Sequence, residues 1–181
     1  MPPLVLVVVF LSFDKVAQRL SAVKSEVSAY SAETGQESSS GTRLKFWTTS
    51  VEAISRKPLM GSGAGSWVTE YNRIEQLKNP LHPSLGAQSH GNPHQEFLLW
   101  GVQLGVGGIF LLFAFAGAVL LDLRKMDRPV ARAGQSVLLA LAVSCLFNSS
   151  LYDAYIGDFF CVSLGVLLAY GFHGREVSRA A

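Results

Sequence analysis

Residues 92–121 read NPHQE FLLWGVQLGVGGIFLLFAFAGAVLL, in which a polar segment containing His94 runs directly into a stretch without charged residues. The stretch from Phe97 to Leu121 reaches the roughly 20 residues that an α-helix needs to cross a hydrocarbon core of about 30 Å. Asn92 favours the N-cap and Pro93 the first helical position, so this pattern predicts His94 in the first turn of the helix. A histidine at the mouth of a membrane-spanning helix is usually kept for a function.

Two further stretches support a membrane protein. Residues 133–152 carry no charge, and residues 159–172 form a shorter apolar run that spans only with its polar flanks included. Of the 181 residues, 49% are hydrophobic but only 15% are charged, whereas soluble domains have about 25% charged residues. Residues 1–13 are too short to span alone. No Lys or Arg precedes them and no cleavage site follows, which favours part of a transmembrane helix over a signal peptide.

The charges predict an orientation. Lys and Arg residues gather in the loop at 122–132 and in the tail at 173–181, and both regions should face the cytoplasm. A net charge of +2 is too mild to indicate nucleic acid binding. The predicted order is a partial or N-terminal transmembrane helix (1–13), an outer loop with amphipathic helices (14–96), a transmembrane helix (97–121), a cytoplasmic loop (122–132), a transmembrane helix (133–152), an outer turn (153–158), a transmembrane helix (159–172) and a cytoplasmic tail (173–181).

The outer loop shows helical patterns of its own. Apolar residues recur at helical spacing from Lys15 to Tyr30, and a second helix should begin with Thr42 as its cap and end before Pro58. In this second helix, Leu44, Trp47 and Val51 would form an apolar stripe for the membrane surface. After a glycine-rich turn, Ser66 should cap a third helix that has Trp67, Tyr71 and Ile74 on one side.

Several residues could carry chemistry. His94 could act as a general base, or be an interfacial histidine without a role. Arg43 lies in the first turn of its helix, where a cation opposes the helix dipole, so it could meet a diphosphate or simply be solvated. The N–H groups around Gly61, Gly63 and Gly65 could bind phosphate oxygens, or the loop could be a plain helix–turn–helix connection.

Other polar and small residues indicate structure. His82, His90 and His94 are not expected to form a metal site, since Asn92-Pro93 interrupts any helix joining His90 to His94 and no Cys or close Asp completes the set. Cys145 and Cys161 should be small buried apolar residues. Three glycines should let helices pack closely: Gly101, Gly105 and Gly108.

These pieces, taken in order, resemble a known family. RLKFW at 43–47, PLMGSGAG at 58–65, NPHQ at 92–95 and the glycines at 105 and 108 are similar to the O-antigen ligase/polymerase family of bacterial membrane glycosyltransferases. The family signature is a His followed by Asn, Ser or Gln, nine further residues, and then a glycine and usually another small residue. His94-Gln95 and Gly105 stand at this spacing.

The resemblance implies an all-α, polytopic integral membrane protein with a large helical periplasmic loop between transmembrane helices, in the bacterial inner membrane. It implies transfer of a glycan from undecaprenyl diphosphate to a sugar hydroxyl of the lipid A core at the periplasmic face, without metal or cofactor. His94 would be catalytic, and Arg43 would hold the diphosphate. The other expected substrate-binding residues are Gln95, Trp47, Gly61, Gly63 and Gly65.

Related functions remain open. Within the family the alternatives are an O-antigen polymerase and a protein O-oligosaccharyltransferase. Family members usually have many more spans, so this chain is expected to be a C-terminal portion. The alternative from another class is therefore a truncated, non-catalytic membrane remnant.

Overall fold

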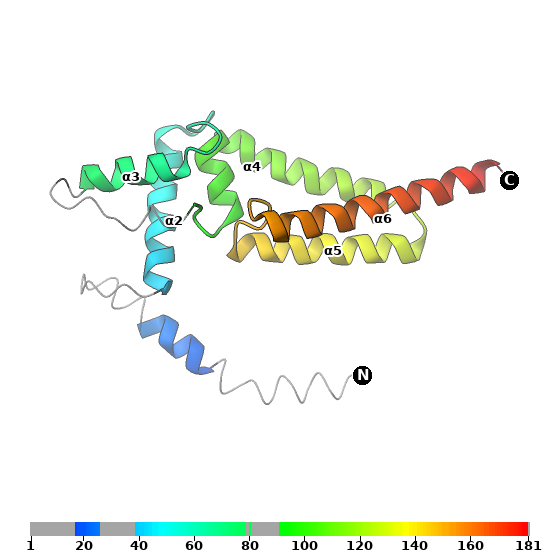
Figure 1. The fold of residues 1–181 in the computed structure, drawn as a ribbon, viewed down its shortest axis with the longest axis horizontal. Coiled ribbons are helices and arrows are strands. Elements are labelled where there is room, and N and C mark those ends of the chain that lie inside the picture. Colours follow the sequence, from blue (N-terminus) through cyan, green and yellow to red (C-terminus); the bar gives the residue numbers. More distant parts are fainter. Residues whose placement is uncertain (1–16, 26–38, 79, 81–90, 181) are drawn as a thin grey trace. The chain divides into compact units, whose positions relative to one another are not determined.

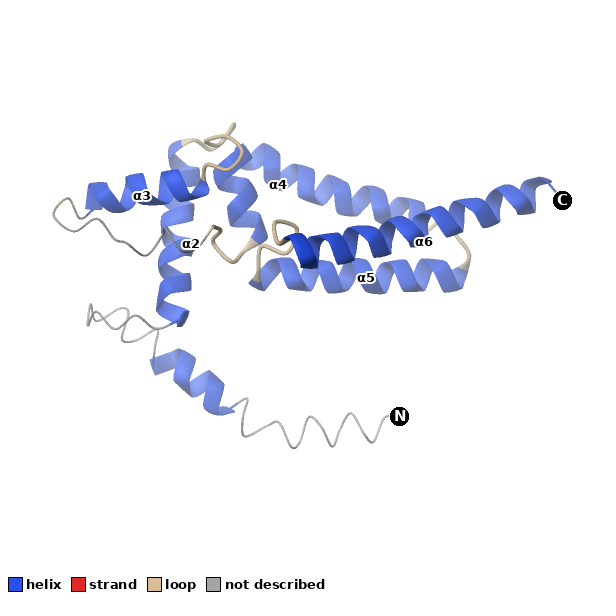
Figure 2. Ribbon diagram, viewed as in Figure 1, coloured by secondary structure: helices blue, strands red, loops and turns tan. Residues whose placement is uncertain are grey.

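The structure, a computed structural model, describes residues 17–25, 39–78, 80 and 91–180. The regular elements of this part of the chain are helices (Figure 2). They are a helix at residues 17–25, α2 (Ser39–Arg56), α3 (Trp67–Lys78), α4 (Glu96–Leu123), α5 (Arg128–Phe147) and α6 (Ala154–Ala180) (Figure 1). The predicted all-α class is confirmed for these residues. The predicted helix at 1–13, most of the loop at 79–90, and His82 and His90 lie outside them.

The chain divides into two compact units, Met1–Lys45 and Phe46–Ala181. In the first unit, the helix at residues 17–25 is mostly exposed, and α2 begins at Ser39. The predicted start at Thr42 is therefore too late. Serines are good N-terminal residues, and the run of serines before Gly41 lets the helix begin earlier.

Among the described residues of the second unit, three helices are long and apolar enough to cross a membrane. They are Glu96–Leu123, Arg128–Phe147 and Ala154–Gly174, and each packs against the other two. Their shared core contains Leu123, Leu141 and Leu164. Cys145 is buried in this core as predicted, but Cys161 is exposed, because it lies on a face of α6 that the described chain leaves uncovered.

The boundary between the last two apolar helices differs from the prediction. α5 ends at Phe147, and residues 148–153 form a turn instead of completing a span to residue 152. Polar side chains in this turn bond to other groups, as Ser150 does with the hydroxyl of Ser144 at 2.6 Å, and so compete with helix formation. Asp153 then accepts the N–H of Ile156 at 3.1 Å, which starts α6 at the point where the sequence predicted a turn.

A separate core forms where α2 and α3 meet the beginning of α4. The predicted buried face of α3 is confirmed, and Ser66 stands at its N-cap position, with its carbonyl accepting the N–H of Glu70 at 2.9 Å. The buried residues of this core are Phe46, Ala53, Trp67, Tyr71, Ile74, Leu99 and Val102.

α2 contributes a different face from the predicted apolar stripe. Val51 is 56% exposed, whereas Thr49 and Ser50 are buried. Their hydroxyls have partners on α3: Thr49 donates to Glu75 at 3.1 Å. Ser50 accepts the indole N–H of Trp67 at 2.8 Å. Because these bonds satisfy the hydroxyls, a polar face can be buried without the cost of unpaired groups.

Candidate active site

His94 lies in the turn immediately before α4 and has a left-handed backbone, with φ 53°. The side-chain oxygen of Asn92 accepts the backbone N–H of His94 at 2.8 Å, a local turn that asparagine commonly forms. Gln95 caps α4 instead of Asn92, because its Oε1 accepts the N–H of Leu98 at 2.6 Å. The prediction that His94 belongs to the first helical turn is wrong, since a helix does not continue through a residue with positive φ.

The turn between α5 and α6 holds this segment from one side. Oδ1 of Asn148 lies 3.3 Å from Nδ1 of His94. The hydroxyl of Ser149, which is fully buried, accepts the backbone N–H of Gln95 at 3.2 Å. Residues more than 50 positions apart in the sequence therefore fix the position of the histidine together.

α2 holds the same segment through two aromatic residues. The ring of Phe46 stacks on the imidazole of His94, with ring centroids 6.4 Å apart and planes 27° apart. Phe46 is itself fixed by edge contacts with Trp67 and Tyr71. The indole N–H of Trp47 donates to the carbonyl of Pro93 at 3.1 Å. Trp47, predicted to bind substrate, thus supports the backbone next to His94.

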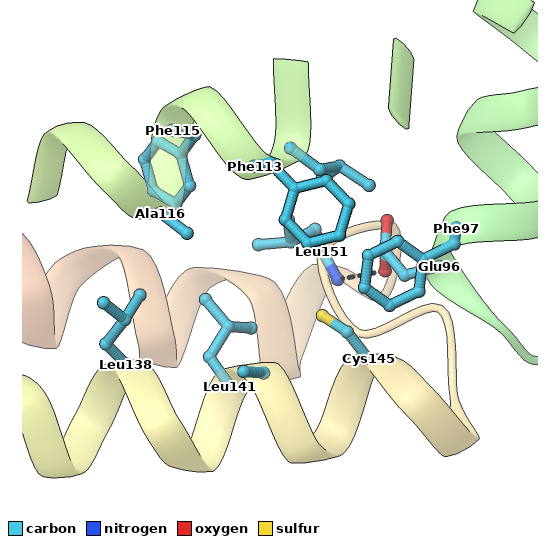
Figure 3. Close-up of a pocket in the computed structure, with 11 residues that line it drawn as sticks. Glu96, Phe97, Phe113, Phe115, Ala116, Leu138, Leu141, Cys145 and Leu151 are labelled. Atoms are coloured by element: carbon cyan, nitrogen blue, oxygen red, sulfur yellow. Dashed lines mark hydrogen bonds between the residues drawn. The ribbon is translucent and has the colours of Figure 1, made fainter. Parts of the chain in front are cut away.

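Glu96 anchors the beginning of α4. Its carboxylate is completely buried and accepts the backbone N–H of Leu151 at 2.9 Å and the indole N–H of Trp100 at 2.8 Å. Figure 3 shows this carboxylate at one end of a pocket, with the dashed bond to Leu151. The carboxylate therefore joins the start of α4 to the α5–α6 turn, directly after the histidine.

The pocket beside Glu96 has a volume of about 100 Å³ and lies between α4 and α5. Its walls are hydrocarbon and aromatic side chains, apart from Glu96 and the thiol of Cys145. The rings of Phe97 and Phe113 stack across it at a centroid distance of 5.6 Å (Figure 3). With both oxygens of Glu96 already accepting hydrogen bonds, the pocket suits an apolar group.

α4 is broken at Gly105, where the backbone has φ 65° and ψ −153°, and its direction changes (Figure 1). The sequence did not predict this break, which needs a conformation that essentially only glycine adopts. The predicted close approach is also present at Gly105, because a Cβ there would lie 2.4 Å from the carbonyl oxygen of Pro58 in the turn after α2. Close packing is confirmed for Gly101, whose added Cβ would lie 2.6 Å from Cδ1 of Ile54. At Gly108 the close approach is to the carbonyl of Trp100, within the same bent helix.

Amides of the glycine-rich loop satisfy the backbone carbonyls that the break in α4 leaves without helical partners. The N–H of Ser62 donates to the carbonyl of Val102 at 2.8 Å, and the N–H of Gly63 donates to the carbonyl of Gln103 at 2.9 Å. A regular helix would satisfy these two carbonyls with amides beyond Gly105. The N–H of Gly65 donates to the side chain of Gln103 at 3.1 Å. The amides of Gly63 and Gly65 are thus used within the protein.

The carboxylate of Glu70 on α3 interacts with Ser62 of the same loop and with the positively charged side chains of Arg73 and Lys57. Burial alone would raise the pKa of Glu70, but hydrogen bonds from Arg73 and Ser62 and the positive charges of Arg73 and Lys57 outweigh it, and the pKa lies below its usual value. Nε of Arg73 is 2.9 Å from the carboxylate, and Nζ of Lys57 is 3.6 Å away. The carboxylate is therefore ionised at neutral pH and joins the loop to α3.

A family model described as O-antigen ligase matches residues 3–113. The chain belongs to the O-antigen ligase family. The resemblance seen in the sequence is thereby confirmed. No curated protein and no solved structure matches the chain.

The O-antigen ligase match includes every residue that the sequence placed in the site. In the second unit the fold brings Trp47, Gln95 and His94 together, while Gly61, Gly63 and Gly65 lie against the break in α4. Arg43 is exposed on α2 and belongs to the first unit. Among the described residues, no group of three or more His, Cys, Asp or Glu side chains is arranged to hold a metal ion.

Sequence reasoning missed Phe46, Glu96 and Asn148 as partners of the histidine segment. Asn148 lies beyond the stretch that matches the O-antigen ligase family. One signal was present: the polar run Asn148-Ser149-Ser150 interrupts an otherwise apolar stretch, and polar groups at membrane depth generally have partners. Glu96 carries no comparable signal, since glutamates recur throughout the outer loop. Phe46 is the only phenylalanine between residues 14 and 96, but a single aromatic residue does not indicate which partner it contacts.

Proposed function

We propose that this chain carries the catalytic face of a ligase that moves a glycan from undecaprenyl diphosphate to a sugar hydroxyl of the lipid A core, at the periplasmic side of the bacterial inner membrane. Membership of the O-antigen ligase family supports this class of reaction. The proposed role of His94 rests on its left-handed backbone, with φ 53°. Contacts from α2 and from the α5–α6 turn hold the residue in this conformation. Strained residues that the surroundings fix in this way cluster at active sites.

In the proposed reaction, the imidazole of His94 takes the proton of the acceptor hydroxyl as its oxygen attacks the anomeric carbon of the donor sugar. Arg43 pairs with the diphosphate and offsets the negative charge that grows on it as the sugar leaves. Gln95 and Trp47 bind substrate as well as supporting the turn around His94. The loop of Gly61, Gly63 and Gly65 would border the donor, with its geometry set by its bonds to α4.

The test compares His94→Asn with native protein in membranes supplied with lipid A-core acceptor and undecaprenyl-diphosphate-linked glycan. Asparagine tolerates a left-handed backbone, so this variant removes the base while keeping the turn. We expect the rate of ladder formation on gels to fall by about 100-fold or more. His173→Asn is the matched control, because His173 is exposed on α6 and far along the chain from the site.

Native-level transfer by His94→Asn would overturn the role of His94. A second arm offers a glycan repeat unit or a Ser/Thr-containing peptide as the acceptor in place of the lipid A core. Use of either by the native protein, with no transfer to the lipid A core, would replace the ligase assignment with a polymerase or a protein O-oligosaccharyltransferase.

A further inference from the structure

We propose that Asn148 is a positioning residue that sets the tautomer of His94. Its amide oxygen would accept the Nδ1–H of the imidazole, so that Nε2 is the nitrogen without a proton. This inference deepens the proposed function and rests on it, since it states which ring nitrogen receives the proton from the acceptor hydroxyl.

The proposed tautomer follows from the two atoms that face each other. Oδ1 of Asn148 lies 3.3 Å from Nδ1 of His94. An amide oxygen only accepts hydrogen bonds, so the pair is favourable only when Nδ1 carries the proton. In a neutral imidazole the other nitrogen is then the acceptor, which is the form that a general base needs.

Asn148 is well placed to impose this choice because its turn is fixed on several sides. Its own backbone N–H closes the last turn of α5 on the carbonyl of Ser144 at 2.9 Å. The next two residues, Ser149 and Ser150, are fully buried, and their hydroxyls bond to Gln95 and Ser144. The oxygen of Asn148 is therefore presented from a packed turn and not from a mobile loop.

A second contact fixes the plane of the imidazole. The ring of Phe46 stacks on it with planes 27° apart, and Phe46 is only 1% exposed. Stacking sets the plane of the ring but not its rotation within that plane. The bond from Nδ1 to Asn148 supplies the missing direction, so the two contacts together determine where Nε2 points.

In the transfer step, Nε2 would take the proton of the acceptor hydroxyl while the acceptor oxygen bonds to the anomeric carbon of the sugar. The bond from that carbon to the diphosphate oxygen breaks, and its electron pair leaves with the undecaprenyl diphosphate. The imidazolium keeps its Nδ1–H on Asn148, a bond that strengthens when the donor becomes charged. Asn148 would thus orient the base and favour its protonated form.

The first experiment reads the tautomer directly, without substrates. The full chain, labelled with ¹⁵N-histidine, is studied by NMR in lipid nanodiscs at alkaline pH, where imidazoles are neutral. The His94 signals are those that disappear in His94→Asn. We expect Nδ1 to be the protonated nitrogen in native protein and in Asn148→Asp, which keeps an oxygen acceptor, and the Nε2–H form to gain in Asn148→Ala.

The second experiment measures transfer by the same variants. Asn148→Ala should lower kcat about 10- to 100-fold with little change in the KM of the donor, as loss of an orienting partner does elsewhere. Asn148→Asp should keep most of the activity, because its carboxylate oxygen still accepts the Nδ1–H. Ser150→Ala is the control for general loosening of the turn, because it removes only the bond to Ser144. It should keep the native tautomer and most of the activity.

The outcomes separate this inference from the proposed function. An Nε2–H tautomer in native protein, or an Nδ1–H tautomer that survives in Asn148→Ala, would overturn the role of Asn148. Equal loss of transfer in all three turn variants would do the same, since it would reveal a structural effect. The expected tautomers in a native protein that transfers no glycan would support the orienting contact and overturn the ligase reaction instead.

Discussion

A Cβ atom on Gly105 would lie 2.4 Å from the backbone carbonyl oxygen of Pro58, which is closer than real Cβ atoms approach any atom. The same carbonyl accepts the N–H of Val106 at 2.7 Å. The turn after α2 and the break in α4 therefore form one joint, in which a signature glycine allows two backbones to touch. This joint sets the direction of the helical arm that follows the histidine.

Gly105→Ala should destabilise the protein by about 3 kcal/mol, because the new side chain meets backbone at Pro58 and Leu59 and the conformation is strained for any other residue. Chemical unfolding in detergent measures the change. Gly107→Ala is the matched control, since its Cβ would make only an ordinary 3.8 Å contact with the carbonyl of Leu59. Equal stability of the two variants would show that the joint is not rigid.

Alanine substitutions at Gly61 and Gly63 distinguish the cost of a steric clash from the cost of a strained backbone conformation. Both have positive φ, 63° and 101°, but a Cβ on Gly61 would lie 2.4 Å from the backbone of Gln103, whereas a Cβ on Gly63 would meet nothing within 4 Å. Gly63→Ala should therefore cost about 1 kcal/mol of strain, and Gly61→Ala clearly more. Thermal unfolding of both variants tests this order. The reverse order would contradict the docking of this loop on α4.

Glu96→Gln should lower the free energy of unfolding by about 1–3 kcal/mol, because an amide has one acceptor oxygen for the two donors, Leu151 and Trp100. Glu52→Gln makes the same chemical change on an exposed part of α2, where ion pairs with Arg56 and Lys78 are screened by solvent. It should cost less than about 1 kcal/mol. If both variants lose the same stability in chemical unfolding, Glu96 is not an anchor.

Glu70 should make stability depend on pH. Its pKa is lowered in the folded protein, so its contribution is fully present above the ordinary value of 4.5 and is lost as the pH falls through the lowered folded value. Glu70→Gln should thus be less stable than native protein at pH 7, by about 1 kcal/mol after allowance for its half-exposed partners. Melting temperatures measured between pH 7 and pH 3 should converge at the acidic end. A constant difference would exclude the ion pairs as its cause.

Arg43→Ala should raise the KM for the undecaprenyl-diphosphate donor about 10-fold and leave the KM for the acceptor unchanged, because a guanidinium binds the diphosphate and not the sugar hydroxyl. Arg56→Ala, on the same helix and paired with Glu52, is the control. Initial rates at varied donor and acceptor concentrations distinguish the two constants. An equal effect on both substrates would indicate that Arg43 is structural.

The sequence by itself determined the helical class, the three apolar helices and the closeness of His94 to the N-terminal end of the first of them. These features depend on local properties, namely runs without charge and helical spacing of apolar residues, which neighbouring residues express directly. The buried face of α3 at Trp67, Tyr71 and Ile74 was predictable for the same reason. Family membership also followed from the sequence, because it depends on short motifs of neighbouring residues and on their order along the chain.

Only the tertiary structure decided how the histidine is held and where the helices stop. Asn148 reaches His94 across 54 positions, and the glycine loop meets the break at Gly105 from about 40 positions away. Local preferences placed the helix start at Asn92 because they contain no information about distant donors and acceptors. The observed start at Glu96 depends on long-range bonds to the α5–α6 turn, which form only when the chain has folded.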